Sequence, residues 1–425
     1  GGLANFAADS DDSDDEDNKK YQINVRTGEL EKRKACLTAL GAMAQFTGAG
    51  FAPHLEGATE AITSCCGYWN GMVREEAALT LPQLVACCDK AFPSGNGEKW
   101  TKGRPEPLSP QSQTLGLACL EQLVELIEGE YEKEVVAKAV EAVEVILGIL
   151  GPSLLQAFDA TKLMNLTMQL LNQQTPCQEA TDDEDEDGAE GEVTDFDHVL
   201  IENVGDLIGA YAALLGDAFL PFFDGFIEAL KNYLNASRPA NDRLMAVGCV
   251  AECVKHFDSR EANLRYFETM KDTLKLALAD GNYSLRRNAA YCVGVFCENT
   301  GGGAAGAYPE LLQALSPLFQ EVPNTDGAAA DNAAAAVCRM VSSAPGAVPL
   351  EQVLPAVLGA LPLKADMSEN RTVYKCLAGL LSERRPPALA ALAQILGVYA
   401  HGLASAKVDE ETKGELRGLV AAVLG

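Results

Sequence analysis

The sequence predicts an all-α protein built as a solenoid of stacked helix pairs, and three observations support this fold class. Hydrophobic residues make up 48% of the chain but aromatic residues only 6%, a balance typical of helices packed through small and medium side chains. A unit of helix, polar turn and helix recurs along the chain. Strand signals are missing, because no Asn-Gly or Asp-Gly turn separates alternating apolar runs.

The repeated unit is clearest in three segments, where an aromatic residue near the start of a first helix is followed by a polar turn and a second helix. The first helices span residues 51–65, 219–234 and 266–279, and the second helices begin near Val73, Asp242 and Leu285. Val247-Gly248 recurs 46 residues later as Val293-Gly294. Periods of about 40–47 residues are those of HEAT or armadillo repeats. The sequence therefore predicts a HEAT-repeat α-solenoid, a superhelix of about nine helix pairs.

A mid-helix glycine lowers helix propensity by about 1 kcal/mol, so we expect neighbouring helices to cross closely at Gly41, Gly248 and Gly294. The expected helices, taken in order, span residues 29–48, 51–66, 71–90, 110–129, 131–151, 152–173, 196–215, 217–234, 241–257, 260–279, 283–299, 307–320, 328–344, 349–361, 368–382, 386–403 and 409–423.

Three segments interrupt the pattern. Residues 9–17 hold seven acidic residues, residues 93–108 read as an irregular loop, and residues 175–195 contain a run of six acidic residues. Blocks of like charge repel themselves and favour disorder. We therefore expect an acidic disordered linker over 1–20, a HEAT-repeat array over 21–425, and an acidic loop over 175–195. The run is either a solvated linker or an electrostatic lure for a basic partner, and its members are Asp182, Asp183, Glu184, Asp185, Glu186 and Asp187.

The charge balance limits the possible partners. The formal net charge is −28, of which the two acidic tracts supply 13 charges, so the rest of the chain is acidic as well. Such a surface repels nucleic acids and anionic lipids and attracts basic proteins. No run of about 20 uncharged apolar residues predicts a membrane span.

No residue pattern predicts catalysis, a cofactor or a metal site. The sequence has no Walker loop, no Gly-x-Ser-x-Gly elbow and no His-Glu-x-x-His motif, so we expect no enzyme. The thirteen cysteines have no metal-ligand spacing to the four histidines, and we interpret them as reduced core residues of a cytosolic or nuclear protein. Because the chain opens with Gly1 and not Met, we expect a piece of a longer protein.

Polar residues on the second helices are the candidate binding site. In a helical solenoid these helices often line one surface, where Asn can hold a peptide backbone and Glu or Asp can pair with Lys or Arg. The alternative for each residue is a structural role such as helix capping. For the arginines Arg74, Arg243, Arg286 and Arg339 we favour a ladder of ion pairs between neighbouring repeats. Trp69 and Trp100 are either partner anchors or packing residues. The candidates are Glu252, Asn288, Tyr291, Glu298, Asp331, Asn332, Ser368, Glu369 and Asn370.

The run from Asp331 to Met340 and the Leu-Pro-Leu-Lys motif at 361–364 resemble the C-terminal repeats of importin-4-type karyopherins, which are nuclear import receptors. The segment from Leu285 to Val295 and the acidic loop after residues 175–178 are similar to that family as well. The resemblance covers nearly the whole chain. It corresponds to the C-terminal half of such a receptor.

The resemblance implies a monomeric receptor that shuttles between cytoplasm and nucleus. Its expected cargo is basic protein with a Lys-rich localisation signal, namely core histones, with or without a histone chaperone, and ribosomal proteins. The family's C-terminal lysine pocket maps onto Glu252, Asn332 and the pair Ser368-Glu369, where relatives carry two adjacent acids. The Ran-GTP and main nucleoporin sites of the family lie in the N-terminal half, which this sequence does not include.

Two alternatives stay open at the level of sequence. A HEAT-repeat scaffold of the phosphatase or condensin type has the same helical period, and an acidic histone chaperone without transport activity has the same electrostatics.

Overall fold

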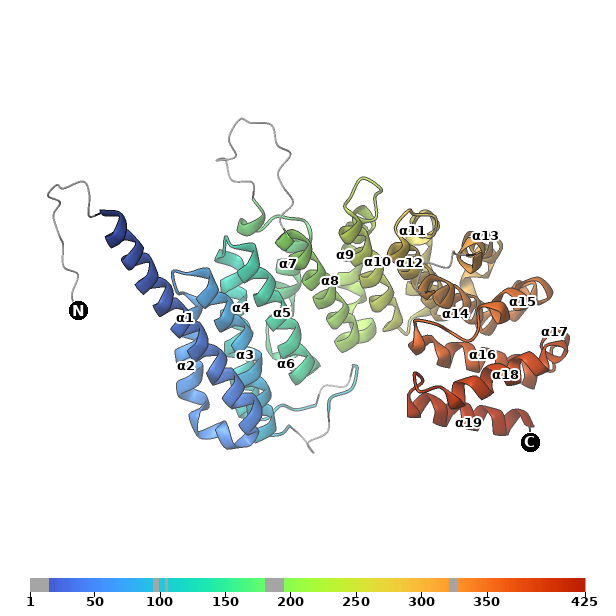
Figure 1. Ribbon diagram of the computed structural model, residues 1–425, viewed down its shortest axis with the longest axis horizontal. Helices are drawn as coiled ribbons and strands as arrows, with labels where there is room; N and C mark the ends of the chain where they lie inside the picture. The colour runs from blue at the N-terminus through green and yellow to red at the C-terminus, as the bar shows by residue number, and fades with distance from the viewer. Residues whose placement is uncertain (1–14, 95–98, 104–105, 180–194, 321–326, 425) are drawn as a thin grey trace. The chain divides into compact units, whose positions relative to one another are not determined.

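The computed structural model describes residues 15–94, 99–103, 106–179, 195–320 and 327–424. Across these ranges the regular structure is helical and no strand occurs (Figure 1), which confirms the predicted all-α fold class. The chain divides into two compact units. The first holds the described residues up to 100, from 106 to 163 and from 175 to 179, and the second holds 101–103, 164–174 and 195 onward.

The first unit begins with α1 (Asp15–Thr47), followed by a 3-10 turn (Gly48–His54) and α2 (Leu55–Cys66). Its other helices are α3 (Gly71–Ala91), α4 (Pro110–Gly129), α5 (Lys133–Leu150) and α6 (Pro152–Ala157). The second helices α1, α3 and α5 pack side by side, while α2 packs on α3 and α4 packs on α5. Helix α7 (Ala160–Leu171) leads from this unit into the next.

In the second unit, five helix pairs follow α8 (Asp195–Leu215). The second helices α8, α10, α12, α14, α16 and α19 contact one another in succession. The pairs are α9 (Leu220–Tyr233) with α10 (Ala240–Lys255), α11 (Arg260–Leu278) with α12 (Tyr283–Asn299), α13 (Tyr308–Leu315) with α14 (Ala328–Ser343), α15 (Leu350–Ala360) with α16 (Asn370–Ser382), and α17 (Pro386–Ala390) plus α18 (Leu392–Ala404) with α19 (Glu410–Leu424).

Local chemistry explains where several helices begin. The side chains of Ser109, Ser259 and Asn282 each accept a hydrogen bond from a backbone N–H in the first turn of α4, α11 and α12, which satisfies a donor that the helix leaves unpaired. Gly151 adopts φ +73° between α5 and α6, a conformation that glycine reaches without steric cost. The aromatic residues that mark first helices are buried. Phe219 before α9, Phe223 in α9 and Tyr266 in α11 form one cluster with Phe257, which follows α10.

Most predicted boundaries agree with the observed ones to within a few residues, and three predictions differ. Helix α1 starts at Asp15 and not near residue 29, so the predicted linker over 1–20 is wrong for residues 15–20. The predicted helix 152–173 is divided into α6 and α7, and 386–403 into α17 and α18. The acidic run 182–187 lies outside the described residues.

The mid-helix glycines do not share one cause. A Cβ at Gly294 would lie 2.9 Å from the Cα of Ala336, so α12 and α14 do cross too closely there for a side chain. At Gly41 the obstacle is the flexible side chain of Gln83. No heavy atom of a neighbouring helix lies within 4 Å of a Cβ at Gly248, so the predicted close crossing is wrong at that position.

All thirteen cysteines are free thiols and eleven of them are buried, as expected of reduced core residues. No cluster of three metal-ligating side chains occurs within the described ranges. Two stretches, Gly28–Cys66 and Phe196–Tyr233, are long and apolar enough to cross a membrane by length and composition alone. Both are interrupted by a 3-10 turn, and 61% of the second apolar window is buried in the protein, as in core helices of soluble folds.

Candidate functional site

The predicted arginine ladder is present. In three places an arginine of a second helix reaches a carboxylate in the turn of the following helix pair. These pairs are Arg74 with Glu130, Arg243 with Asp280, and Arg339 with Glu369. Arg286 instead donates to the backbone carbonyl of Asp280. In three places the ladder thus joins one helix pair to the next, as the structural interpretation of Arg74, Arg243 and Arg339 expects.

Arg339 on α14 is the most buried member of this ladder. Its Nη1 and Nη2 donate to the two carboxylate oxygens of Glu369 at 2.8 and 3.1 Å, and its Nε donates to Glu298 at 2.8 Å. The side chains of Arg339 and Glu369 are 9% and 4% exposed, against 57% for Glu298. Burial opposes the charged guanidinium, but Glu369 and Glu298 outweigh it and raise the pKa of Arg339. Glu369 is therefore not open to a lysine of a partner.

Asp331 is also committed to the fold. Its carboxylate accepts backbone N–H bonds from Lys364 at 2.9 Å, Ala365 at 2.7 Å and Asp366 at 3.0 Å, and the residue is 1% exposed. The turn that leads from α15 toward α16 is thus tied to α14. Asp331 was a predicted cargo contact, and the structure gives it this structural role instead, because its acceptor positions are filled from within the chain.

Two of the predicted asparagines are buried as well. Asn332 donates to the carbonyl of Ala328 at 2.9 Å and to the Asp366 carboxylate at 3.0 Å, and Asn370 donates to the carbonyl of Met367 at 2.9 Å. They are 2% and 3% exposed. Both N–H groups of the Asn332 carboxamide thus have partners within the chain, and its expected role in holding a peptide backbone stays a prediction.

A pocket of about 480 Å³ nevertheless gathers four of the nine candidates. Asn288 and Tyr291 come from α12, Asn332 from α14, and Ser368 from the turn before α16. Asp366 lines the same pocket, where Asn332 and Ser368 donate to its two oxygens at 3.0 and 2.6 Å. The half-buried Asp366 is thus a positioned carboxylate at the pocket wall, and sequence reasoning did not select it.

Asn288 still has a carboxamide N–H₂ group that can bind a ligand in this pocket. Arg287 donates from Nε to Oδ1 of Asn288 at 3.2 Å, which orients the carboxamide so that its N–H₂ group can donate to a carbonyl. Burial raises the pKa of Tyr291 to about 12, so its hydroxyl is neutral near pH 7. The pocket therefore combines amide, hydroxyl and carboxylate groups, which suits a peptide segment with one basic side chain.

Glu252 belongs to an acidic patch on α8 and α10 and also lies near Tyr291 of the pocket, whose pKa it helps to raise. A hydrogen bond with His256 and the neighbouring Lys255 lower the pKa of Glu252 to about 2, and its side chain is 46% exposed. Partial burial, followed by repulsion from Glu202 and Glu252, raises the pKa of Asp206. We call Glu202, Asp206 and Glu252 the α8–α10 acidic patch. Neither Glu202 nor Asp206 was selected from the sequence, since nothing in the local pattern shows that α8 presents them beside Glu252.

The comparison with known proteins gives sequence relatives over nearly the whole chain. Probable importin subunit beta-4 of Schizosaccharomyces pombe is 28% identical over 431 aligned residues, which cover 98% of this chain and 39% of the relative. Importin-4 of Homo sapiens is 27% identical over 390 residues, covering 91% of this chain and 34% of the relative. The chain thus spans about two fifths or less of these proteins. No family model matches it.

Solved structures agree on the fold. Kap121p bound to Nup53p superposes with a TM-score of 0.68 at 14% identity, covering 93% of this chain and 34% of that one. Kap121p bound to Pho4p gives the same TM-score and identity, with 92% and 36% covered. The sequence relatives and the shared architecture lead to one conclusion: this chain is a HEAT-repeat protein related over nearly its whole length to importin-4-type karyopherins.

Proposed function

We propose that this chain is the cargo-binding part of a nuclear import receptor and that it binds a lysine-rich protein segment on the second helices of its second unit. The observation that carries the proposal is the pocket of Asn288, Tyr291, Asp366 and Ser368, because it unites a backbone-binding amide with an accessible carboxylate. The α8–α10 acidic patch supplies further carboxylates on second helices of the same unit.

The chemistry of a lysine-rich segment fits these groups. An ammonium group can pair with Asp366, while Asn288 and Arg287 donate to carbonyls of the bound backbone and the ring of Tyr291 packs on the lysine stem. A second lysine can pair with Asp206, whose pKa is raised by partial burial and by repulsion from Glu202 and Glu252 that a cation would relieve. Each such contact at a partly exposed site contributes on the order of 1 kcal/mol or less, so affinity depends on several lysines acting together.

Support for transport comes from the relatives. The sequence relatives are named importins, and solved structures show Kap121p bound to Pho4p and to Ste12p. The family resemblance adds core histones and ribosomal proteins as cargo, with the receptor moving between cytoplasm and nucleus. A net charge of −28 favours such basic cargo over nucleic acid.

A peptide titration tests the proposal. A lysine-rich peptide of the histone-tail type and a twin with glutamine at every lysine are titrated into the chain at low and at physiological ionic strength. We expect binding of the lysine peptide only, weaker at higher salt because exposed ion pairs are screened. In the Asn288→Ala/Tyr291→Ala variant we expect about tenfold weaker binding, corresponding to roughly 1.4 kcal/mol.

A matched control uses exposed glutamates of first helices. Glu228 on α9 and Glu351 on α15 are exposed and do not line the pocket of Asn288, Tyr291, Asp366 and Ser368. The Glu228→Lys/Glu351→Lys variant changes the net charge by four units without touching the proposed site. The Glu202→Lys/Asp206→Lys variant makes the same change in net charge within the α8–α10 acidic patch. If both variants lose equal affinity for the lysine peptide, the loss reflects net charge alone and the patch is not part of the site.

A further inference from the structure

A second candidate binding site lies in the first unit, in a groove of about 590 Å³ between α2 and α4. These are the first helices of consecutive pairs, so the groove is separate from the second-helix surface proposed for cargo. Its floor and walls are apolar, with Leu55, Cys88, Phe92 and Leu115 among the lining residues. Small side chains at Ala52 and Ala118 leave room that larger residues would fill. The volume suits one or two large apolar side chains of a ligand.

The charged residues of this groove are all acidic. Glu56 and Glu60 stand one turn apart on α2, and both are exposed. Within the described part of the chain, neither carboxylate forms an ion pair. Two like charges at this spacing on one helix are mildly destabilising. The groove therefore combines an apolar interior with two carboxylates that lack a cation.

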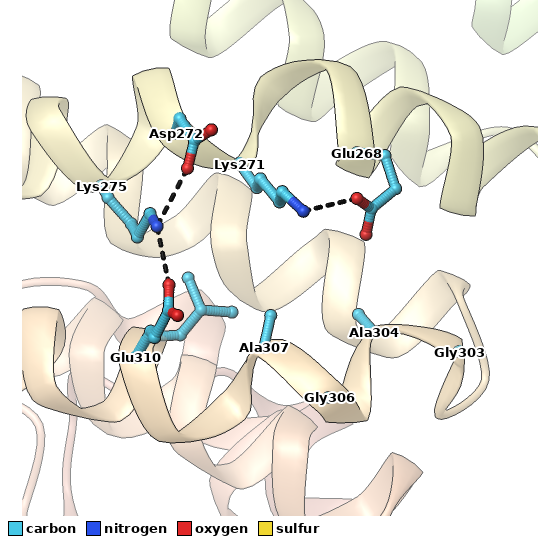
Figure 2. Close-up of a pocket in the computed structure, with 10 residues that line it drawn as sticks. Glu268, Lys271, Asp272, Lys275, Gly303, Ala304, Gly306, Ala307 and Glu310 are labelled. Carbon is cyan, nitrogen blue, oxygen red and sulfur yellow. Dashed lines mark hydrogen bonds and ion pairs between the residues drawn. The ribbon is translucent and has the colours of Figure 1, made fainter.

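The groove between α11 and α13 also lies between consecutive first helices, but its acidic residues pair with lysines of the chain itself. Figure 2 shows its lysines turned toward its acids. Lys271 pairs with Glu268 at 2.5 Å, and Lys275 pairs with Asp272 at 2.9 Å and with Glu310 at 2.7 Å. Three carboxylates are thus neutralised by two lysines of the chain itself. No lysine or arginine is among the residues that line the α2–α4 groove, so its two carboxylates can pair with cations of a partner.

We propose that the α2–α4 groove binds an amphipathic helix of a partner protein, with large apolar residues in the groove and two lysines or arginines one turn apart on Glu56 and Glu60. An i, i+4 pair of basic residues matches the spacing of the two glutamates. The apolar face of such a helix follows the i, i+3, i+4 pattern of helix-in-groove recognition. The shape of the groove favours a ligand with an apolar face, and the charge of Glu56 and Glu60 favours a basic ligand.

The test uses the full chain and three synthetic helices. The first carries leucine and phenylalanine on one face and lysines four residues apart beside it, the second has glutamate in place of lysine, and the third keeps lysine but has serine in place of the apolar residues. We expect the first to bind and both twins to bind at least about tenfold more weakly, since each lacks one of the two matched features. Equal binding of the glutamate twin or the serine twin would overturn the proposal.

Variants locate the binding. Glu56→Lys/Glu60→Lys is expected to weaken binding of the first helix about tenfold or more, whereas Glu228→Lys/Glu351→Lys, with the same change in charge, should leave it within about twofold. Ala118→Trp and Thr59→Trp fill the groove from opposite walls and should each abolish binding while helicity is kept. Asn288→Ala/Tyr291→Ala should have no effect, which separates this site from the cargo site. Unchanged affinity in both tryptophan variants would exclude the groove.

Discussion

Arg339 holds Glu369 through two parallel hydrogen bonds of 2.8 and 3.1 Å, and both side chains are nearly excluded from solvent. The bond joins α14 to the turn that opens α16. A bidentate pair of this kind is short and directional, and removing one partner leaves a buried charge without compensation. Sequence reasoning placed Glu369 among cargo contacts, and the structure makes it part of the fold.

This pair gives the first prediction. Glu369→Lys should lower the free energy of unfolding by about 3–5 kcal/mol, because it places two cations together in a buried site. Urea denaturation followed by circular dichroism measures the change. Glu298→Gln is the matched control: Glu298 bonds the same arginine but is 57% exposed, and such pairs contribute about 1 kcal/mol or less.

A double replacement separates charge from packing. In Arg339→Met/Glu369→Leu both charges are gone, and stability should return close to that of the original chain. If Glu369→Lys instead unfolds at the original urea midpoint and loses only peptide binding, Glu369 is a cargo contact after all.

The helices were predictable because their signals are local. Pro110 with Ser109 marks the start of α4, and Gly151 marks the end of α5. The site was less predictable, because a second-helix residue such as Asn332 or Asp331 shows the same polarity whether it faces solvent or a neighbouring turn. Whether such a residue is buried depends on the position of the 364–366 backbone, and that position comes from packing between repeats. Arg74, Arg243 and Arg339 were assigned correctly to ion pairs between repeats and Arg286 was not, and their partners could not be named from the sequence because Glu130 and Glu369 lie at unequal distances along the chain.

The contrast between two glycines gives a second prediction. Gly294→Ala should lower the free energy of unfolding by about 1–3 kcal/mol, because the new methyl group meets Ala336 across the α12–α14 crossing. Gly248→Ala should raise it by about 0.5–1 kcal/mol, since space is open and alanine favours the helix. In thermal unfolding, the midpoint should fall for Gly294→Ala and rise for Gly248→Ala. Shifts of the same sign would show that the crossing distance is not the controlling factor.

Asp331 gives a third prediction, which joins fold to function. Asp331→Ala removes the acceptor for three backbone N–H groups at residues 364–366, and unpaired buried donors cost about 1–3 kcal/mol each where water cannot replace the partner. We expect a loss of about 2–4 kcal/mol in total and faster hydrogen exchange at these amides. Weaker binding of the lysine peptide should follow, because the same turn positions Asp366 and Ser368. Unchanged exchange at 364–366 would contradict this role.

The pKa of Asp206 gives a prediction for pH dependence. Partial burial and the nearby Glu202 and Glu252 raise this pKa, so the folded state holds a proton on Asp206 at a higher pH than the unfolded chain does. The charged form therefore lowers stability at neutral pH, and this cost disappears as the pH falls and the group is protonated in both states. Asp206→Asn should raise the unfolding midpoint at pH 7, with a gain that shrinks as the pH falls through the raised pKa of Asp206 and is gone below the ordinary aspartate pKa. Glu351→Gln, at an exposed site, should show no such gain. A gain that stays constant into acid would rule out charge as its cause.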